Sequence, residues 1–303
     1  MVAALGGNAL LRRGEPLELG TQRGHVRQAA AALSRLAADH DLVLTHGNGP
    51  QVGLLALQAE AYREVRPYTL DVLDAQSEGL IGYLLEQELR SALPGREVAT
   101  LLTQIEVDPE DAAFQRPTKP IGPVYDAAQG ERLARAGGWA MASDRGGLRR
   151  VVASPLPKRI LELDSIRLML EAGVIVICAG GGGIPVVVEG DGKLRGVEAV
   201  IDKDRSAALL ALSVGADALL LLTDTPGVYE GWGTTSARLL RHETPQGLRS
   251  LRFDKGSMGP KVEAACEFVE RSGRWAAIGA LDEAELVVRG CAGTQIRAIQ
   301  AAA

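Results

Sequence analysis

Three glycine-rich segments each follow a short apolar run, and their composition is typical of an anion-binding site. They are Leu5-Gly6-Gly7-Asn8-Ala9, Thr45-His46-Gly47-Asn48-Gly49-Pro50-Gln51 and Ala179-Gly180-Gly181-Gly182-Gly183-Ile184-Pro185. Glycine at a strand end lets backbone N–H groups approach a ligand, and a helix starting directly afterwards adds the positive end of its dipole. Pro50 fits the first position of such a helix. Tight turns alone could explain one segment, but three of them favour a phosphate site.

Lysine is scarce, with 6 lysines against 27 arginines, and half of the lysines lie in sharply bent segments. Lys119 lies in a proline-rich stretch, Lys203 lies between two aspartates, and Lys261 lies at the predicted start of a helix. A cation at a helix N-terminus is unfavourable by about 0.3–1 kcal/mol, and a bound anion would reverse the sign. Phosphoryl transfer needs positive charge on the moving group, and Asp204 could hold the lysines. A solvated surface pair with Asp202 or Asp204 is the alternative interpretation of Lys203.

Other motifs give weaker indications. The standard P-loop and the dinucleotide-binding glycine motif are both absent, so phosphate chemistry must be organised differently. The turn over residues 223–229 could hold a base and ribose, or could be a strand followed by a Pro-Gly turn. The histidines lack metal-ligand spacing, and a structural hydrogen bond is the favoured role of His46. Residues 75–79 only weakly resemble a nucleophile elbow, which disfavours a hydrolase.

Short apolar runs alternate with longer amphipathic runs, which predicts βαβ units around a mainly parallel sheet covered on both faces. The predicted strands are Val2–Leu5, Asp41–Thr45, Val98–Val107, Val174–Ala179 and Ala218–Thr223. The predicted helices are Thr21–His40, Ala75–Leu93 and Ser257–Ser272. Residues from about 115 to 157 interrupt this alternation with prolines at both ends, so we expect a small subdomain or lid there.

Composition limits the class of protein. The chain has 303 residues, of which 46% are hydrophobic, and a formal charge of −5 with only 4% aromatic residues. No basic surplus exists to bind phosphates along a nucleic acid, so we expect no nucleic-acid partner. The apolar runs are too short for a membrane span, and the three separated cysteines suit reduced thiols. We therefore expect a cytoplasmic protein with no membrane partner.

In these residues the sequence resembles the carbamate kinases of the amino acid kinase family, over essentially the whole chain. The matching motifs occur in the right order at residues 4–10, 46–53, 117–123, 154–158, 178–185, 197–204 and 256–261. The family resemblance implies a three-layer αβα sandwich around a mainly parallel open sheet of about eight strands. It also implies a single domain over residues 1–303. Its acceptor-binding lobe would cover about residues 1–190, with the protruding subdomain at about 115–157, and its nucleotide-binding lobe about 191–303.

The resemblance implies a homodimer that catalyses ATP + carbamate ⇌ ADP + carbamoyl phosphate with Mg²⁺. The expected direction is ATP synthesis in arginine catabolism by the deiminase route, and supply of carbamoyl phosphate for biosynthesis is the alternative. The implied catalytic residues are Lys119, Lys203, Asp204 and Lys261. The implied phosphoryl- and carbamate-binding residues are Gly6, Gly7, Asn8, Gly47, Asn48, Gly180 and Gly181. The implied nucleotide-binding residues are Thr223, Asp224, Pro226, Tyr229, Met258 and Gly259. Mg²⁺ would be carried by the nucleotide, with no expected protein ligand.

Two departures from related kinases affect these expectations. Ala4 stands where many other amino acid kinases carry a lysine, which matches the carbamate kinases, where the lysine of the protruding subdomain is thought to take over. The turn over residues 223–228 resembles acetylglutamate and uridylate kinases more closely. The rival functions are another acyl-phosphate kinase, such as an acetylglutamate kinase, and a non-catalytic phosphate- or nucleotide-binding regulator. The motif around Lys119 argues against the first, and the intact lysine and aspartate set argues against the second.

Overall fold

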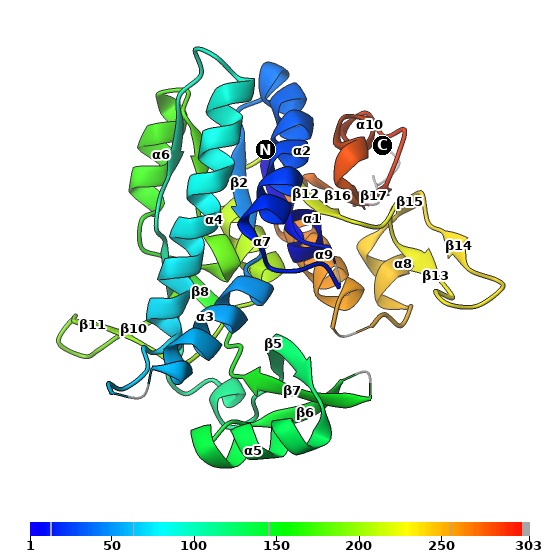
Figure 1. The fold of residues 1–303 in the computed structure, drawn as a ribbon. Helices are drawn as coiled ribbons and strands as arrows, with labels where there is room; N and C mark the ends of the chain where they lie inside the picture. The colour runs from blue at the N-terminus through cyan, green and yellow to red at the C-terminus, as the bar shows by residue number, and fades with distance from the viewer. Residues whose placement is uncertain (13, 63, 145, 255, 299–303) are drawn as a thin grey trace.

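The computed structural model describes residues 1–12, 14–62, 64–144, 146–254 and 256–298, without the side chains of Asn8 and Ala9. Within these residues, eight strands form the central sheet in the order β15-β17-β16-β12-β1-β2-β9-β3 (Figure 1). In that order the strands span His242–Glu243, Thr294–Ile296, Trp275–Ala280, Ala218–Thr223, Val2–Leu5, Val43–His46, Ile175–Ile177 and Val98–Thr100. All neighbours are parallel except β16 and β17, which confirms the predicted mainly parallel open sheet.

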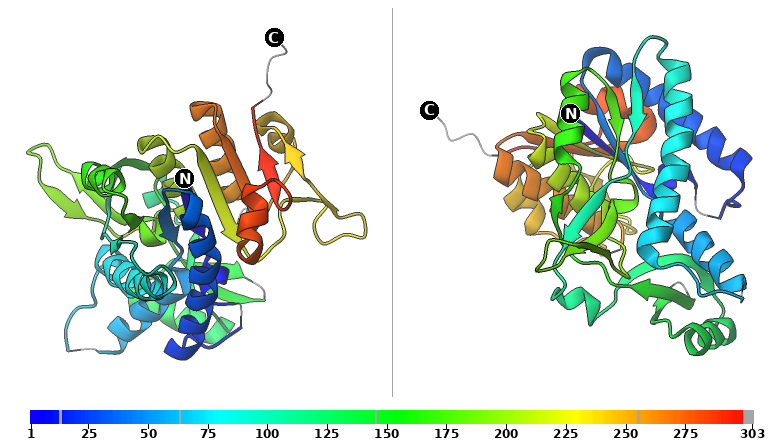
Figure 2. Two further views of the ribbon diagram at one scale, coloured as in Figure 1. Left: turned by 90° about the horizontal axis from the view of Figure 1, so that it is seen from above. Right: turned by 90° about the vertical axis from the view of Figure 1, so that its left-hand side faces the viewer.

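Apolar layers cover both faces of this sheet, because successive side chains of a strand point to opposite faces. In β1, Val2 and Ala4 belong to one layer, and Ala3 and Leu5 belong to the other. The first layer is covered by α6 (Leu163–Glu171), α7 (Lys203–Ser213), α8 (Pro245–Arg249) and α9 (Met258–Ser272). The second is covered by α2 (Leu19–Asp39), α4 (Leu70–Ala92) and α10 (Ala284–Val288). Figure 2 shows the sheet between the two sets of helices, which confirms the predicted αβα sandwich.

The predicted helices are present with shifted ends. Helix α4 begins earlier than predicted, because Leu70 and Leu73 are buried and extend its apolar face. Helix α9 ends where Gly273 adopts a left-handed φ of 69°, a conformation that glycine adopts without strain. Helix α3 (Gly49–Ala61) begins within the second glycine-rich segment, with Pro50 in its first turn, as predicted. The first segment leads into the short helix α1 (Gly7–Leu10).

The prediction of one strand over Val98–Val107 is wrong. Strand β3 ends at Thr100, and β4 (Gln104–Val107) joins a second sheet in the order β11-β10-β4-β8. Its other strands are β11 (Leu194–Gly196), β10 (Ile184–Val188) and β8 (Pro157–Ile160). Between β3 and β4, the Thr103 backbone N–H donates to Glu78 on α4 instead of to a neighbouring strand. The apolar run gives no sign of this break, because the acceptor lies elsewhere in the chain.

The predicted subdomain protrudes below the body in Figure 1. It consists of α5 (Ala127–Gly137) and a sheet of β5 (Lys119–Tyr125), β7 (Gly147–Val152) and β6 (Met141–Asp144). Its backbone touches α3, where a Cβ on Gly53 would overlap Gly122. This contact holds β5 beside the second glycine-rich segment.

The remaining elements are short. They are β13 (Tyr229–Glu230), β14 (Arg238–Leu239) and the 3₁₀ turns η1 (Ala112–Phe114), η2 (Gly180–Gly182) and η3 (Leu281–Glu283). In the described ranges, no helix combines the length and the apolar character that a membrane crossing requires.

Candidate active site

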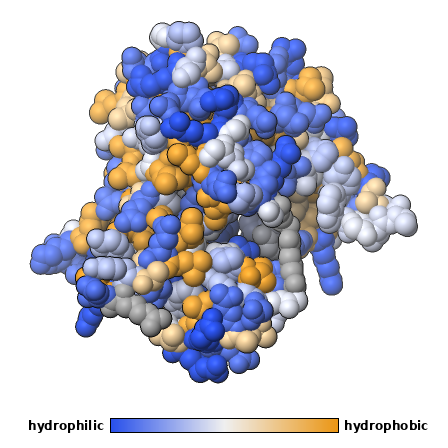
Figure 3. Space-filling model, viewed as in Figure 1, coloured by the Kyte–Doolittle hydropathy of each residue, from blue (hydrophilic) through white to orange (hydrophobic). Residues whose placement is uncertain are grey.

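A cleft lies between the protruding subdomain and the carboxyl ends of β1, β2 and β12, and the surface in Figure 3 is hollowed there. Ligands of open α/β sheets bind at such strand ends. The predicted residues that line the cleft are Gly6, Gly7, Gly47, Asn48, Lys119, Gly181, Lys203, Asp204, Thr223 and Lys261. The three glycine-rich segments, which are far apart in sequence, therefore meet in this cleft. The side chain of Asn8 lies outside the described part of the structure.

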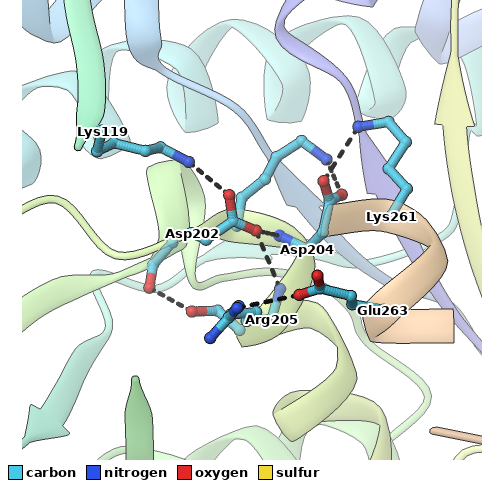
Figure 4. Close-up of polar contacts among 9 residues, drawn as sticks. Lys119, Asp202, Asp204, Arg205, Lys261 and Glu263 are labelled. Atoms are coloured by element: carbon cyan, nitrogen blue, oxygen red, sulfur yellow. Dashed lines mark hydrogen bonds and ion pairs between the residues drawn. The ribbon is translucent and has the colours of Figure 1, made fainter. Parts of the chain in front are cut away.

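Two aspartates organise three lysines in this cleft (Figure 4). Lys203 Nζ lies 2.5 Å from Asp204 Oδ1, and Lys261 Nζ lies 3.0 Å from Asp204 Oδ2. Lys119 Nζ approaches from β5 and lies 2.5 Å from Asp202 Oδ2. In this group of side chains, three ammonium groups face two carboxylates, which leaves one positive charge. The cluster therefore complements an anion.

Two helices present this charge at their N-terminal ends. Asp202 caps α7, because its Oδ1 accepts from the backbone N–H groups of Asp204 and Arg205 at 3.0 and 3.3 Å. Lys261 lies in the first turn of α9. Both helix dipoles add positive potential at the cleft. Lys203 is buried, so the alternative interpretation of a solvated surface pair is wrong.

Burial and pairing set the protonation states. Burial lowers the pKa of Lys203 to about 8, although the charge of Asp204 opposes this shift. Burial alone would raise the pKa of Asp204, but the adjacent charges of Lys203 and Lys261 outweigh it and hold that pKa well below its usual range. Burial alone would raise the pKa of Asp202, but the charge and hydrogen bond of Lys119, together with the charge of Lys203, outweigh burial and lower this pKa. Both aspartates are therefore ionised at neutral pH, and Lys203 loses its proton in mild alkali.

The glycine-rich segments approach one another too closely for larger residues. A Cβ on Gly47 would lie 3.0 Å from the Gly7 nitrogen, and a Cβ on Gly181 would overlap the Asn48 amide. Gly180 does not fit its expected role as a donor to phosphate, because its N–H donates to Glu78 Oε1 at 2.7 Å. Glu78 is a buried residue of α4, so this hydrogen bond attaches the third glycine-rich segment to α4.

The predicted nucleotide-binding residues do not all lie together. Thr223 lines the cleft, whereas Asp224 and Pro226 line a neighbouring pocket. The other three have structural contacts: the rings of Tyr229 and Trp232 are 5.0 Å apart, Met258 packs against the apolar layer under α7 and α9, and the Gly259 N–H donates to the Asp254 carbonyl. The binding of a base by these residues stays a prediction.

His46 is a structural residue, as predicted. Its Nδ1 lies 3.2 Å from the Gly47 carbonyl oxygen, and burial lowers its pKa to about 4, so the ring is neutral. Residues 75–79 lie inside α4, which excludes a nucleophile elbow. Among the described side chains, no three His, Cys, Asp or Glu residues are grouped to hold a metal ion.

Sequence reasoning gave no site-supporting role to four polar residues that support the site, which are Asp202, Asp74, Ser77 and Glu78. Asp202 precedes two helical residues that were singled out, and an aspartate just before a helix is a recognisable N-cap. The other three recur at helical spacing, so they share one face of α4. That spacing is a signal for a buried polar face, and it lies within a segment otherwise rich in leucine.

Comparisons with known proteins agree with one another. A sequence model of the amino acid kinase family matches residues 1–279. The chain is 53% identical to a carbamate kinase from Rhizobium meliloti (strain 1021), with 98% of this chain and 92% of the relative covered. It is 52% identical to a carbamate kinase from Escherichia coli (strain K12), with 98% of each covered. A solved carbamate kinase from Giardia lamblia bound to AMP-PNP has a TM-score of 0.90 at 38% identity, with 98% of both chains covered.

Proposed function

The chain belongs to the carbamate kinases of the amino acid kinase family, and we propose that it transfers a phosphoryl group between ATP and carbamate, giving ADP and carbamoyl phosphate. The observation that carries this proposal is the cluster of Lys119, Lys203 and Lys261 on two aspartates between the glycine-rich segments. Phosphoryl transfer depends mostly on positioning and on charge stabilisation, and this cluster supplies both.

The lysines have separate roles in the proposed reaction. Lys203 and Lys261 share Asp204, so their ammonium groups are fixed with respect to each other and neutralise charge on the transferred group. Lys119 comes from the opposite wall of the cleft and contacts the carbamoyl end. Because Asp202 is its partner, an incoming phosphate competes with Asp202 for this ammonium group. No covalent intermediate on the protein is needed.

Magnesium enters the proposal with the nucleotide. Both aspartates that line the cleft are engaged by lysines, so they are poor candidates for metal ligands. We propose that Mg²⁺ arrives on the phosphates of ATP or ADP, where it neutralises phosphate charge.

The cellular setting is also a proposal. We propose a cytoplasmic enzyme, consistent with the three free thiols of Cys178, Cys266 and Cys291. Carbamoyl phosphate is a mixed anhydride and a strong phosphoryl donor, which favours ATP synthesis in arginine catabolism. We further propose that residues 1–190 bind the acceptor and that residues 191–303 bind the nucleotide.

A homodimer is supported by an apolar strip on the outer face of α4. Val72, Leu80 and Tyr83 are exposed at helical spacing on this face. The exposed Leu102 extends the strip, since a Cβ on Gly79 would lie 3.9 Å from its side chain. Figure 3 shows hydrophobic side chains on this side of the molecule. We propose that a second copy of the chain covers the strip.

Formation of ATP from ADP and Mg²⁺ tests the proposed reaction, with carbamoyl phosphate, acetyl phosphate and N-acetylglutamyl phosphate as separate donors. We expect carbamoyl phosphate to give the highest kcat/KM. Preferential use of another donor would keep phosphoryl transfer but reject carbamate as the acceptor. Binding of ADP without ATP formation from any donor would support the rival function of a regulator.

A further inference from the structure

The amide of Asn48 makes contacts that are unusual for a residue at the start of a helix. Asn48 is the N-cap residue of α3, yet its side chain does not cap that helix. Its Nδ2 instead donates to Asp74 Oδ1 at 3.0 Å and to Ser77 Oγ at 2.8 Å, both on α4. All three residues are almost completely buried. The Asn48 side chain is thus held by hydrogen bonds to α4.

The chemistry of Ser77 determines which way this amide faces. A hydroxyl has one proton, and Ser77 Oγ donates it to the Asp74 backbone carbonyl at 2.9 Å. Toward Asn48, Ser77 Oγ therefore accepts. In this arrangement the atom of Asn48 that faces Ser77 is the NH₂ nitrogen. The two N–H bonds of that NH₂ group are then used by Ser77 and Asp74.

The amide oxygen of Asn48 is left for the cleft. Asn48 lines the cleft, and among the described residues no side chain or backbone group donates to its Oδ1. Asn48 is also absent from the described residues whose buried side-chain polar atoms lack a partner.

Few described side chains that line the cleft can accept a hydrogen bond, and the others besides the Asn48 amide and the carboxylates are the hydroxyls of Thr223 and Ser257. The lysines can only donate, and the carboxylates of Asp202 and Asp204 already accept from lysines and from backbone N–H groups. Carbamoyl phosphate has the complementary arrangement, because its oxygens accept and its NH₂ group donates. Acetyl phosphate has a methyl group in place of the NH₂ group and cannot donate.

We propose that Ser77 and Asp74 are positioning residues that direct the Asn48 amide oxygen into the cleft, where it accepts from the NH₂ group of carbamoyl phosphate and selects it over acetyl phosphate. This inference rests on the proposed function, since it assigns the specificity of the same site. A site built around such a hydrogen bond discriminates against a ligand that lacks the donor, because the buried acceptor is then left without a partner.

The test compares kcat/KM for the two donors in the full-length protein and in three variants. Asn48→Ala removes the acceptor, and Ser77→Ala removes only the group that orients it. Ser206→Ala is the matched control, because Ser206 is also buried and donates to a backbone carbonyl, that of Gly182, at 2.7 Å. Acetyl phosphate is measured as a donor and as a competitive inhibitor, so its interaction is quantified even at low turnover. Thermal unfolding checks that each variant is folded.

For Asn48→Ala, we expect the ratio of kcat/KM for carbamoyl phosphate to kcat/KM for acetyl phosphate to fall about 10- to 100-fold. Ser77→Ala should lower this kcat/KM ratio by a smaller factor, and Ser206→Ala should leave the ratio unchanged. Equal losses for both donors in both Asn48→Ala and Ser77→Ala would overturn the inference and leave the proposed function intact. An unmodified protein that makes no ATP from carbamoyl phosphate would instead overturn the proposed function, and the inference with it.

Discussion

Asp204 accepts from two buried ammonium groups, one on each carboxylate oxygen, and so fixes the charge that the cleft offers to a phosphate. Buried charges are costly unless they are paired, and removing one partner leaves the other uncompensated. Two lysines share this single carboxylate, so the pair carries a surplus positive charge. A bound phosphate would compensate that surplus, which links the stability of the cluster to its ligand.

The first prediction concerns pH. Because burial lowers the pKa of Lys203 to about 8, its ammonium group is present below this pH and lost as the pH rises through it. We expect kcat/KM for carbamoyl phosphate to fall as the pH rises above about 8, since this ratio reports groups of the free enzyme. The measurement is a kcat/KM profile between about pH 6 and 10.

Lys203→Arg is the control for this profile. The guanidinium group stays protonated over the whole range, so the alkaline fall should disappear even though the variant is less active. The same alkaline fall in Lys203→Arg would contradict the assignment to Lys203.

At the scale of elements, each lysine depends on where a helix or strand begins. Lys203 begins α7, Lys261 lies in the first turn of α9, and Lys119 begins β5. Helix periodicity and the position of Pro260 predict the start of α9 from the sequence, and the prolines around Lys119 predict a separate subdomain. The ion pair between Lys119 and Asp202 could not be predicted, because it joins residues 83 positions apart.

Contacts with α4 explain the other differences between prediction and structure. The break between β3 and β4 and the loss of the Gly180 N–H as a phosphate donor both come from Glu78. Glu78 is buried, and burial raises its pKa to about 8. Hydrophobic periodicity treats such a residue as solvent-facing, so it gives the helix correctly but not its polar contacts.

The second prediction concerns Lys119→Ala. Because Lys119 reaches the cleft from the subdomain, we expect KM for carbamoyl phosphate to rise about tenfold or more, with the Kd for ADP unchanged. Steady-state kinetics and calorimetric titration with ADP measure the two quantities.

Lys158→Ala is the matched control for Lys119→Ala. Lys158 also pairs with an aspartate, Asp108, but on the exposed surface, so its loss should change neither quantity. An equal weakening of ADP binding and of carbamoyl phosphate binding in Lys119→Ala would contradict the role of Lys119.

At the scale of the whole molecule, the strand order brings the phosphate-binding segments together. The strand order β12-β1-β2-β9 makes the glycine-rich segments after β1, β2 and β9, and the turn after β12, neighbours at one edge of the sheet. Alternation of strands and helices predicts a parallel sheet, but it does not give this order, because all the strands have similar apolar sequences. The family resemblance supplied the shared architecture that the pattern alone left open.

The third prediction concerns assembly. We expect the unmodified chain to be a dimer and Tyr83→Glu to be a monomer. A charge on the outer face of α4 would be buried in the proposed dimer interface without a partner of opposite charge. Size-exclusion chromatography with light scattering measures both masses.

Leu286→Arg is the control for assembly, since Leu286 is similarly exposed but lies on α10. It should remain a dimer. A dimer of Tyr83→Glu as stable as that of the unmodified chain would place the interface elsewhere.

The most direct test of the proposed chemistry is the rate of ATP formation from carbamoyl phosphate and ADP by Lys261→Ala. Charge stabilisation by one such group is worth about 2.7–4 kcal/mol, so kcat should fall about 100- to 1000-fold. ADP binding and the melting temperature should be largely retained, and Lys193→Ala, which removes an exposed lysine, should be fully active. Undiminished turnover of Lys261→Ala would contradict the central claim that this buried lysine cluster carries phosphoryl transfer.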